Sequence, residues 1–210
     1  MAYGPNLAQI PLAEYRDVLK RLTLTPGRRP LTEDIDARFA ALERQGIRTA
    51  ANLAKALASP ARIAALAVST DIPAKYLTLL KRELGSLTPK PVPLASFTGV
   101  DGGLPAALAR RGIQTSKAYY ESEPGDGGAL YALCDLVRIN GVGAAAAAAF
   151  YAAGYRCAQD VADTNAETLL EAVTAANREH RYYGAKLGVK DMRFCIEYAS
   201  LLVKYGGSGR

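Results

Sequence analysis

Apolar residues recur at helical spacing along almost the whole chain. One stripe near the N-terminus comprises Leu12, Tyr15, Val18, Leu19 and Leu22, and the last clear one lies at about residues 190–204. Apolar positions three and four residues apart cover one face of a helix, and the sequence lacks the alternating pattern of strands. The pattern therefore predicts an all-α chain of about a dozen short helices.

Proline and glycine divide these predicted helices. "TPGRRP" at 25–30 ends the first helix, and "SLTPKPVPLA" at 86–95 is the strongest break because its prolines impose extended backbone. "SEPGDGG" at 122–128 is typical of an exposed loop, and "YGGSGR" at 205–210 of a loose tail.

A repeated turn is visible in three segments, "FAALERQGIRTAANL", "LPAALARRGIQTSKAY" and "AAAFYAAGYRCAQDV". Each contains a helix that ends in glycine, then a large apolar residue, then residues that open the next helix. We expect a left-handed conformation at the three glycines, Gly46, Gly112 and Gly154. The next helices would begin after Thr49, Thr115 and Cys157, of which threonine is a good cap and cysteine a poor one.

A second pattern precedes each of these turns by eleven residues. "LVRINGVG" at 136–143 contains a complete Gly-apolar-Gly turn, "LASFTGVD" at 94–101 has Asp101 in place of the second glycine, and Glu33-Asp34-Ile35 has none. A helix, a Gly-apolar-Gly hairpin and a second helix form the helix-hairpin-helix pattern. We therefore expect tandem helix-hairpin-helix repeats in a compact helical bundle. The expected parts are a basic N-terminal helix and turn (1–30), a degenerate first unit (31–90), the second and third units (91–204) and a flexible tail (205–210).

The complete hairpin carries the candidate chemistry. Unpaired amides at the start of the helix after Gly141, Val142, Gly143 and Ala144 can bind a phosphate oxygen. Arg138 and Arg156 would add charge nearby, although "AAAAAAF" follows the hairpin where a strong DNA binder carries a base. A purely structural turn is an equal alternative, because alanines let two helices pack closely. At the second hairpin the structural interpretation is favoured, because Asp101 would repel phosphate.

The net charge of +6 is unevenly distributed. Residues 1–90 hold 14 basic and 8 acidic side chains, whereas residues 91–210 hold 12 of each. Long-range attraction of an anion would first involve the N-terminal basic residues Arg16, Lys20, Arg21, Arg28 and Arg29. The alternative, which is the more frequent case, is that they cover the solvent face of a helix and its following turn.

Enzymatic sites are poorly supported by the sequence. His180 is the only histidine, so a Ser/His/Asp triad would depend on this one residue and a multi-histidine metal site cannot be assembled. Tyr182 and Lys186 have the spacing found in short-chain dehydrogenases, but no strand and glycine-rich loop precede them. "GDGG" at 125–128 also lacks a preceding strand and is expected to be a turn.

One acidic cluster, Glu33, Asp34 and Asp36, would suit a divalent cation. The favoured interpretation is a helix start, with Thr32 as the capping residue and the carboxylates in the first turn. We therefore expect a non-enzymatic protein without metal or cofactor.

Cysteine usage and hydropathy bear on location. Cys134, Cys157 and Cys195 form no CxxC pair, and their odd number suits a reducing compartment. The longest uncharged apolar stretch, 141–153, is shorter than the roughly 18 residues that a membrane span needs. The expectation is a cytoplasmic protein with no membrane partner.

The aromatic residues suggest a second kind of partner. The chain has 12 tyrosines, 4 phenylalanines and no tryptophan, and four of the tyrosines form the adjacent pairs Tyr119–Tyr120 and Tyr182–Tyr183. Adjacent helical positions face different ways, so we expect one member of each pair in the core and the other at a rim. Exposed tyrosines could stack on unpaired bases, but core or partner packing is favoured. Tyrosines and alanine-rich helix faces also suit a protein interface, including a homodimer.

Three segments together resemble a known family. They are "SPARIAALAVSTDIPAKYLTLLKREL" at 59–84, "LCDLVRINGVG" at 133–143 and "GYRCAQDVADTNAETLLEAVTAAN" at 154–177. They are similar to a bacterial domain family of unassigned function built from paired helix-hairpin-helix units, over roughly residues 31–203. The resemblance implies a compact all-α fold and a nucleic-acid role, with no established activity.

Two functional hypotheses follow. The first is a non-enzymatic protein that binds the backbone of DNA or RNA weakly and without reading sequence. The alternative is a protein-interaction scaffold, self-associating or not, whose hairpins are structural only.

Overall fold

The computed structural model describes residues 2–22, 24–122 and 128–206. It is mostly helical (65%) and the described residues form no strand, which confirms the all-α class. The chain divides into two compact units: unit 1 comprises Met1–Pro5 and Pro89–Arg210, and unit 2 comprises Asn6–Thr88. The turn predicted at 125–128 and the tail predicted at 205–210 lie mostly outside the described residues.

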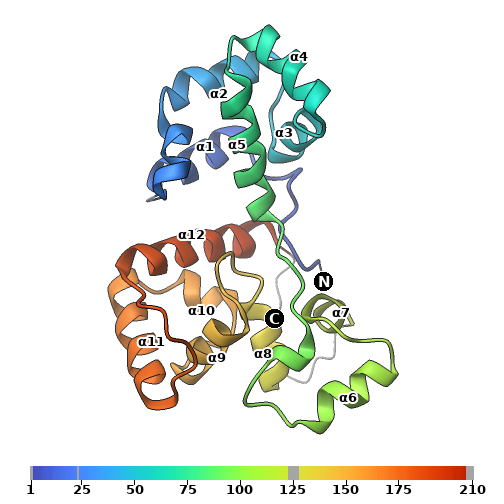
Figure 1. Cartoon of the computed structure of the whole chain (residues 1–210), viewed down its shortest axis with the longest axis vertical. Helices are drawn as coiled ribbons and strands as arrows, with labels where there is room; N and C mark the ends of the chain where they lie inside the picture. Colours follow the sequence, from blue (N-terminus) through green and yellow to red (C-terminus); the bar gives the residue numbers. More distant parts are fainter. Residues whose placement is uncertain (1, 23, 123–127, 207–210) are drawn as a thin grey trace. The chain divides into compact units, whose positions relative to one another are not determined.

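Unit 2 is a small helical bundle. Its helices are α1 (Leu12–Arg21), the 3-10 helix η1 (Pro26–Thr32), α2 (Ile35–Arg44), α3 (Ala50–Ala56), α4 (Pro60–Thr70), α5 (Ala74–Leu84) and the 3-10 turn η2 (Gly85–Leu87). The predicted apolar stripe of α1 is buried, and its Tyr15 ring packs against Phe39 of α2. Helices α1 and α2 contact each other, as do α4 and α5 (Figure 1).

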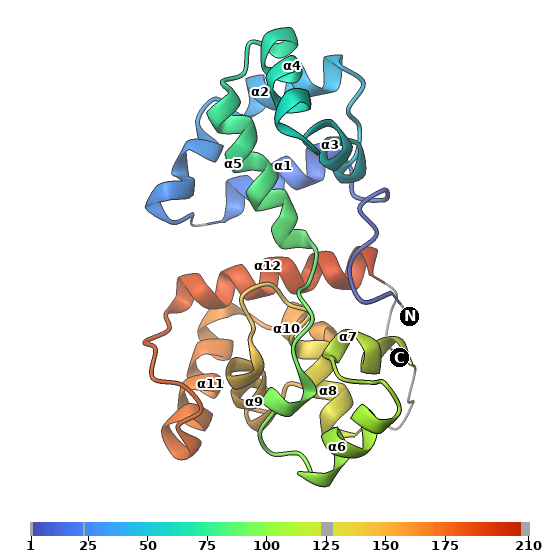
Figure 2. The ribbon, with the colours of Figure 1, turned by 45° about the vertical axis from the view of Figure 1, so that its right-hand side comes forward.

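Unit 1 has a larger set of helices. They are the 3-10 turn η3 (Leu94–Ser96), α6 (Gly103–Arg110), α7 (Ser116–Glu121), α8 (Ala129–Leu136), α9 (Ala144–Ala152), α10 (Ala158–Ala162), α11 (Ala166–His180) and α12 (Val189–Tyr205). The long helix α12 packs across α10 and α11, while α9 packs between α8 and α11 (Figure 2). The alanines of α9 are used in this packing, since Ala147, Ala148 and Ala149 are buried.

The three repeated turns have the predicted geometry. Gly46, Gly112 and Gly154 have φ angles of +77°, +80° and +98°, which is the left-handed region that ends a helix. Thr49 and Thr115 then cap α3 and α7, each hydroxyl accepting a hydrogen bond from a backbone amide three residues later at 3.2 Å. The third turn has a capping box, in which the carboxylate of Asp160 accepts the amide of Cys157 at 3.1 Å.

Two of these turns each pair with a short segment that lies earlier in the chain, and the two segments have similar sequences. The helical pattern of the sequence did not indicate this pairing. "IPLA" at 10–13 lies against the first turn and "VPLA" at 92–95 against the second, through the isolated bridges Pro11–Thr49 and Pro93–Thr115. The carbonyl before each proline accepts the first amide of the next helix. Ala50 donates to Ile10 at 3.0 Å, and Ser116 donates to Val92 at 2.7 Å. We call 10–13 and 92–95 the Pro-Leu-Ala segments.

Two local predictions were wrong. Helix α2 begins after Asp34, which has a left-handed φ of +47°, and the Thr32 hydroxyl donates back to the Arg29 carbonyl instead of capping that helix. Tyr119 and Tyr120 are both buried, whereas one of them was expected at a rim. The reason is that Tyr120 packs against Tyr131 of α8 and also against Tyr3 from the N-terminal segment.

Candidate nucleic-acid interface

The Gly141–Ala144 hairpin joins α8 to α9 in unit 1. Gly141 has a φ of +90°, and a Cβ atom at this position would lie 3.4 Å from Cε1 of Phe194 on α12. Val142 is buried, and its amide donates to the Ile139 carbonyl at 3.0 Å. The turn is thus fixed by a buried valine and by a glycine that carries no side chain against α12.

The start of α9 is open to solvent. The first backbone amides of a helix have no acceptor within the helix, and no side chain among the described residues caps them at α9. Gly143 is exposed, and a Cβ placed on it would meet nothing within 4 Å. Four other helices, α3, α4, α7 and α11, are capped by Thr49, Ser59, Thr115 and Asn165. The geometry at α9 suits an anion that approaches the amides directly.

Arg138, predicted to add charge beside this hairpin, is buried with 4% of its surface exposed. Its Nε donates to the Tyr3 carbonyl at 2.8 Å, and its Nη1 donates to the Tyr120 hydroxyl at 2.5 Å and to the Asp135 carboxylate. The guanidinium also lies over the Tyr120 ring, 4.3 Å from its centroid. Arg138 is therefore engaged inside unit 1, which corrects the expectation that it serves the hairpin.

Asp135 explains why an arginine is buried here. Its Oδ2 accepts the amide of Ala158, the first residue of α10, at 2.6 Å. In the first two repeated turns the equivalent amides, those of Ala50 and Ser116, donate to the carbonyls of Ile10 and Val92. The Asp135 carboxylate thus takes the place of a Pro-Leu-Ala segment at the third turn. Because a buried carboxylate needs a charged partner, Arg138 accompanies it.

The same network holds the N-terminal segment in unit 1. The Tyr3 hydroxyl shares a 2.6 Å hydrogen bond with the Ser116 hydroxyl, which also accepts the Val92 amide at 2.9 Å. Burial raises the pKa of Tyr3 to about 12. Tyr3 is 3% exposed, so this segment is a packed part of unit 1.

Arg156 is exposed but lies at the other end of α9. Nine helical residues span roughly 14 Å, so Arg156 does not lie beside Gly143. Its guanidinium lies 3.9 Å from the centroid of the Tyr151 ring and donates to the Tyr151 carbonyl. The structure brings neither predicted arginine to the hairpin.

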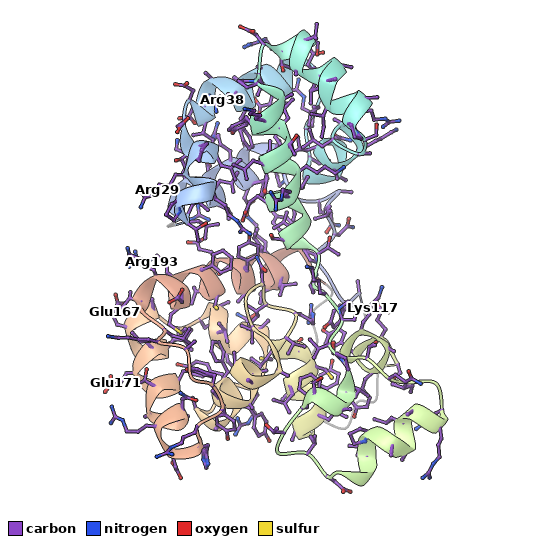
Figure 3. All side chains as sticks on the ribbon, in the orientation of Figure 1. Arg29, Arg38, Lys117, Glu167, Glu171 and Arg193 are labelled. Carbon is purple, nitrogen blue, oxygen red and sulfur yellow. The ribbon has the colours of Figure 1, made fainter. Side chains whose placement is uncertain are left out.

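Helix α12, which lies against the hairpin at Phe194, carries basic residues that the sequence motifs did not indicate. Phe194 places this helix against Gly141, and Lys190 lies one helical turn before Phe194. Arg193 is the neighbour of Phe194 and lies 4.0 Å from Glu167 of α11 (Figure 3). Both cations are exposed. The sequence motifs could not indicate Lys190 and Arg193, because α12 is far from the hairpin along the chain and meets it only through the packing of Phe194.

The N-terminal basic residues belong to unit 2. Arg16 pairs with Asp17 and Asp36 at 2.8 and 3.3 Å, and Lys20 pairs with Asp36 at 2.9 Å. The hydrogen bond from Lys20 lowers the pKa of the Asp36 carboxyl.

The remaining basic residues of this group differ in their surroundings. Arg28 pairs with the buried Glu83 at 2.7 Å, and Arg21 and Arg29 are exposed. Unit 2 holds 13 basic and 8 acidic residues, whereas unit 1, which contains the hairpin, holds 13 and 12. Most of the positive charge is thus in the unit without the complete hairpin.

Other kinds of site find little support in the described part of the chain. No group of three or more His, Cys, Asp or Glu side chains could hold a metal ion there. His180 is about half exposed, beside Glu179 at 3.7 Å. None of the described helices is both long enough and apolar enough to cross a membrane.

Residues 128–202 match the model of a family described as Domain of unknown function (DUF4332). The match runs from the start of α8 into the last part of α12, and so includes the hairpin, the third repeated turn and the α11–α12 connection. No curated protein and no solved structure matches the chain. This part of unit 1 therefore carries a domain of unknown function, within the region where the sequence resembled such a family.

Proposed function

We propose that this protein is a non-enzymatic helix-hairpin-helix protein that binds the nucleic-acid backbone weakly and without reading sequence. The observation that supports this function is the open N-terminus of α9 at Gly143. Neither arginine first expected there contributes to the proposal.

A phosphate oxygen would accept hydrogen bonds from the amides of Ala144 and Ala145. The partial positive charge at the helix N-terminus favours an anion at this position. Exposed glycines at 141 and 143 leave room for a bulky phosphodiester to approach the backbone. Backbone amides contact no base edge, so this contact carries no sequence information.

The affinity is expected to be modest. Lys190 and Arg193 on α12 supply positive charge near the hairpin, and Arg193 is shared with Glu167. Because few phosphates are neutralised, the binding constant should fall with salt along a shallow slope.

Five of the residues that suggested a protein scaffold are used inside unit 1. Ala147, Ala148 and Ala149 are buried within α9, and Tyr119 and Tyr120 are buried in α7. They offer no free surface to a partner, so we favour the backbone-binding function.

The test is fluorescence anisotropy of labelled single- and double-stranded DNA and RNA, at low and at moderate salt. Gly143→Asp places a carboxylate over the open amides. Gly143 has a φ of −86°, so aspartate fits the backbone and is itself a favourable cap. We expect unchanged folding and about a tenfold loss of affinity, the size of one hydrogen-bonded charge contact.

Gly102→Asp is the matched control. Gly102 is exposed in the same unit and precedes α6, and a Cβ placed on it would meet nothing within 4 Å. The two variants therefore make the same change in charge at an open position. Gly102→Asp should reduce affinity far less than Gly143→Asp. Equal losses in the two variants, or no binding by the unaltered protein at low salt, would contradict the proposed function.

A further inference from the structure

The segment 178–193, from the end of α11 into α12, concentrates the positive charge of unit 1. It holds five basic residues and two acidic ones, whereas the rest of unit 1 holds eight basic and ten acidic. The five basic side chains are all exposed: Arg178, Arg181, Lys186, Lys190 and Arg193. This segment therefore differs in charge from the remainder of its unit.

The acidic residues around it set where the cationic surface lies. Asp191 caps α12 by accepting the Gly188 amide at 2.8 Å, and Glu179 lies 3.7 Å from the His180 ring. Glu167 and Glu171 lie on the first half of α11, where Glu167 faces Arg193 (Figure 3). The positive charge is thus least balanced by acidic side chains at the C-terminal end of α11 and in the connection after it, from Arg178 to Lys186.

The backbone of this part is held in place by Asn177. Its side-chain amide donates to the Tyr183 carbonyl and accepts the Tyr183 amide, both at 3.0 Å. Its own carbonyl accepts the Arg181 amide at 2.8 Å. The turn from His180 to Tyr183 is thus fixed at three points, and it presents its side chains in a defined arrangement.

Arg181 occupies an unusual conformation for its residue type. Its φ is +53°, the left-handed position that ends α11, where glycine or asparagine is the common residue. An arginine there costs stability, and such outliers concentrate at functional sites.

Aromatic rings accompany these cations. Tyr182 is half-buried, and the His180 ring lies 5.4 Å from it at a 48° angle. Tyr183 is also half-buried, and burial raises its pKa. The half-buried Tyr182 thus follows the exposed Arg181 directly in the chain, and aromatic rings among cations are the composition of surfaces that bind single strands.

We propose that the His180–Tyr183 turn, with Arg178 and Lys186, binds single-stranded nucleic acid. Phosphates would pair with the arginines while an unpaired base stacks on Tyr182. The inference rests on the proposed function for the kind of polymer bound, but it assigns a surface other than the Gly141–Ala144 hairpin. The half-buried Tyr182 ring favours a nucleic acid over an acidic protein, because only a nucleic acid has bases that can stack on it.

The first test compares a labelled oligo-dT with a labelled duplex of the same length. Tyr182→Ala should lower oligo-dT affinity about tenfold, because base stacking on an aromatic ring carries that much free energy. Duplex affinity should change less than about twofold, since paired bases stay stacked on one another. Tyr182→Phe keeps the ring and should bind like the unaltered protein. Equal losses for both probes in Tyr182→Ala would overturn the single-strand assignment.

The second test uses Arg181→Gly, which removes the charge and relieves the left-handed backbone. Oligo-dT affinity should fall several-fold. The slope of the logarithm of the binding constant against the logarithm of the salt concentration should become less steep by about 1. The melting temperature should stay unchanged or rise by about 2–4 °C. The charge control is Arg110→Ala with Arg111→Ala, two exposed arginines at the end of α6, which should cost less affinity than Arg181→Gly alone.

The results separate the two proposals. If the unaltered protein binds neither probe, the proposed function fails. If Gly143→Asp weakens binding while Tyr182→Ala and Arg181→Gly do not, the hairpin function stands and this inference is overturned. If only the two turn variants weaken binding, this inference stands and the hairpin contact falls. If polyglutamate binds the unaltered protein more tightly than oligo-dT does, the surface belongs to an acidic protein and this inference is also overturned.

Discussion

At the residue scale, Asp135 and Arg138 place two opposite charges inside unit 1. Asp135 receives the Ala158 amide, and Arg138 balances the carboxylate while also binding Tyr3 and Tyr120. Arg138→Met would leave a buried carboxylate without its cation, which costs about 3–5 kcal/mol of unfolding free energy. Adding Asp135→Asn should recover part of this loss, because the amide oxygen still accepts from Ala158. Urea denaturation of the single and double variants measures both effects.

Arg156→Met is the matched control for this prediction. Arg156 is an exposed arginine of the same unit, so its removal should cost less than about 1 kcal/mol. A small cost for Arg138→Met together with weaker nucleic-acid binding would show that Arg138 serves a ligand and not the fold.

These residues also show what the sequence could and could not predict. The left-handed glycines 46, 112 and 154 and the caps Thr49 and Thr115 were predicted correctly, because each depends on its immediate neighbours. The position of Arg138 three residues before Gly141 suggested a role at the hairpin. Its burial depends on Tyr3 and Ala158, whose proximity the local sequence does not reveal.

At the element scale, the α8–α9 hairpin depends on the absence of a side chain at Gly141. Gly141→Ala would place a Cβ at a φ of +90° and 3.4 Å from Phe194, so we expect a loss of about 1–2 kcal/mol in unfolding free energy. Thermal or urea unfolding measures the loss. Gly143→Ser is the control, since serine suits a cap with a φ of −86° and should change stability by less than about 0.5 kcal/mol. Equal tolerance of both changes would mean that the turn is not fixed as described.

The elements differ in how far the sequence predicts them. Helices such as α1 and α5 follow from apolar spacing alone, because burial of one face selects the period. The Pro-Leu-Ala segments pair through backbone groups with turns far along the chain, so the only trace in the sequence is the repeated "PLA" at 11–13 and 93–95. The third turn lacks even this trace, since the Asp135 side chain supplies the acceptor.

At the scale of the whole molecule, the division between the units falls after Thr88, inside the proline-rich segment that the sequence marked as its strongest break. Local composition could not reveal that Met1–Pro5 belongs to unit 1, because the assignment depends on the contacts of Tyr3. The same division separates most of the basic residues from the complete hairpin. Each unit therefore has to be tested for nucleic-acid binding through its own residues.

Both units share one response to alkaline pH. Burial raises the pKa of Tyr3 and of Tyr76 to about 12 from an ordinary value of 10.0, and that of Cys134 and of Cys195 to about 12 from 9.0. Between these values the unfolded chain has released protons that the folded chain still holds, so unfolding becomes more favourable as pH rises. The stability that these groups contribute is complete below about pH 9 and is lost progressively toward pH 12.

Urea unfolding measured from about pH 7 to pH 11 should therefore show a falling free energy above about pH 9. Cys134→Ala with Cys195→Ala should shift the onset of the fall upward, because the groups that remain are the buried tyrosines, with an ordinary pKa of 10.0, and Cys157, whose pKa is also raised from 9.0 but which is only partly buried. The same burial should keep both thiols unreactive toward a disulfide reagent in the folded protein, with the partly exposed Cys157 reacting first. A stability that is flat over this pH range, or equal reaction of all three thiols, would contradict the packing of these groups in the two units.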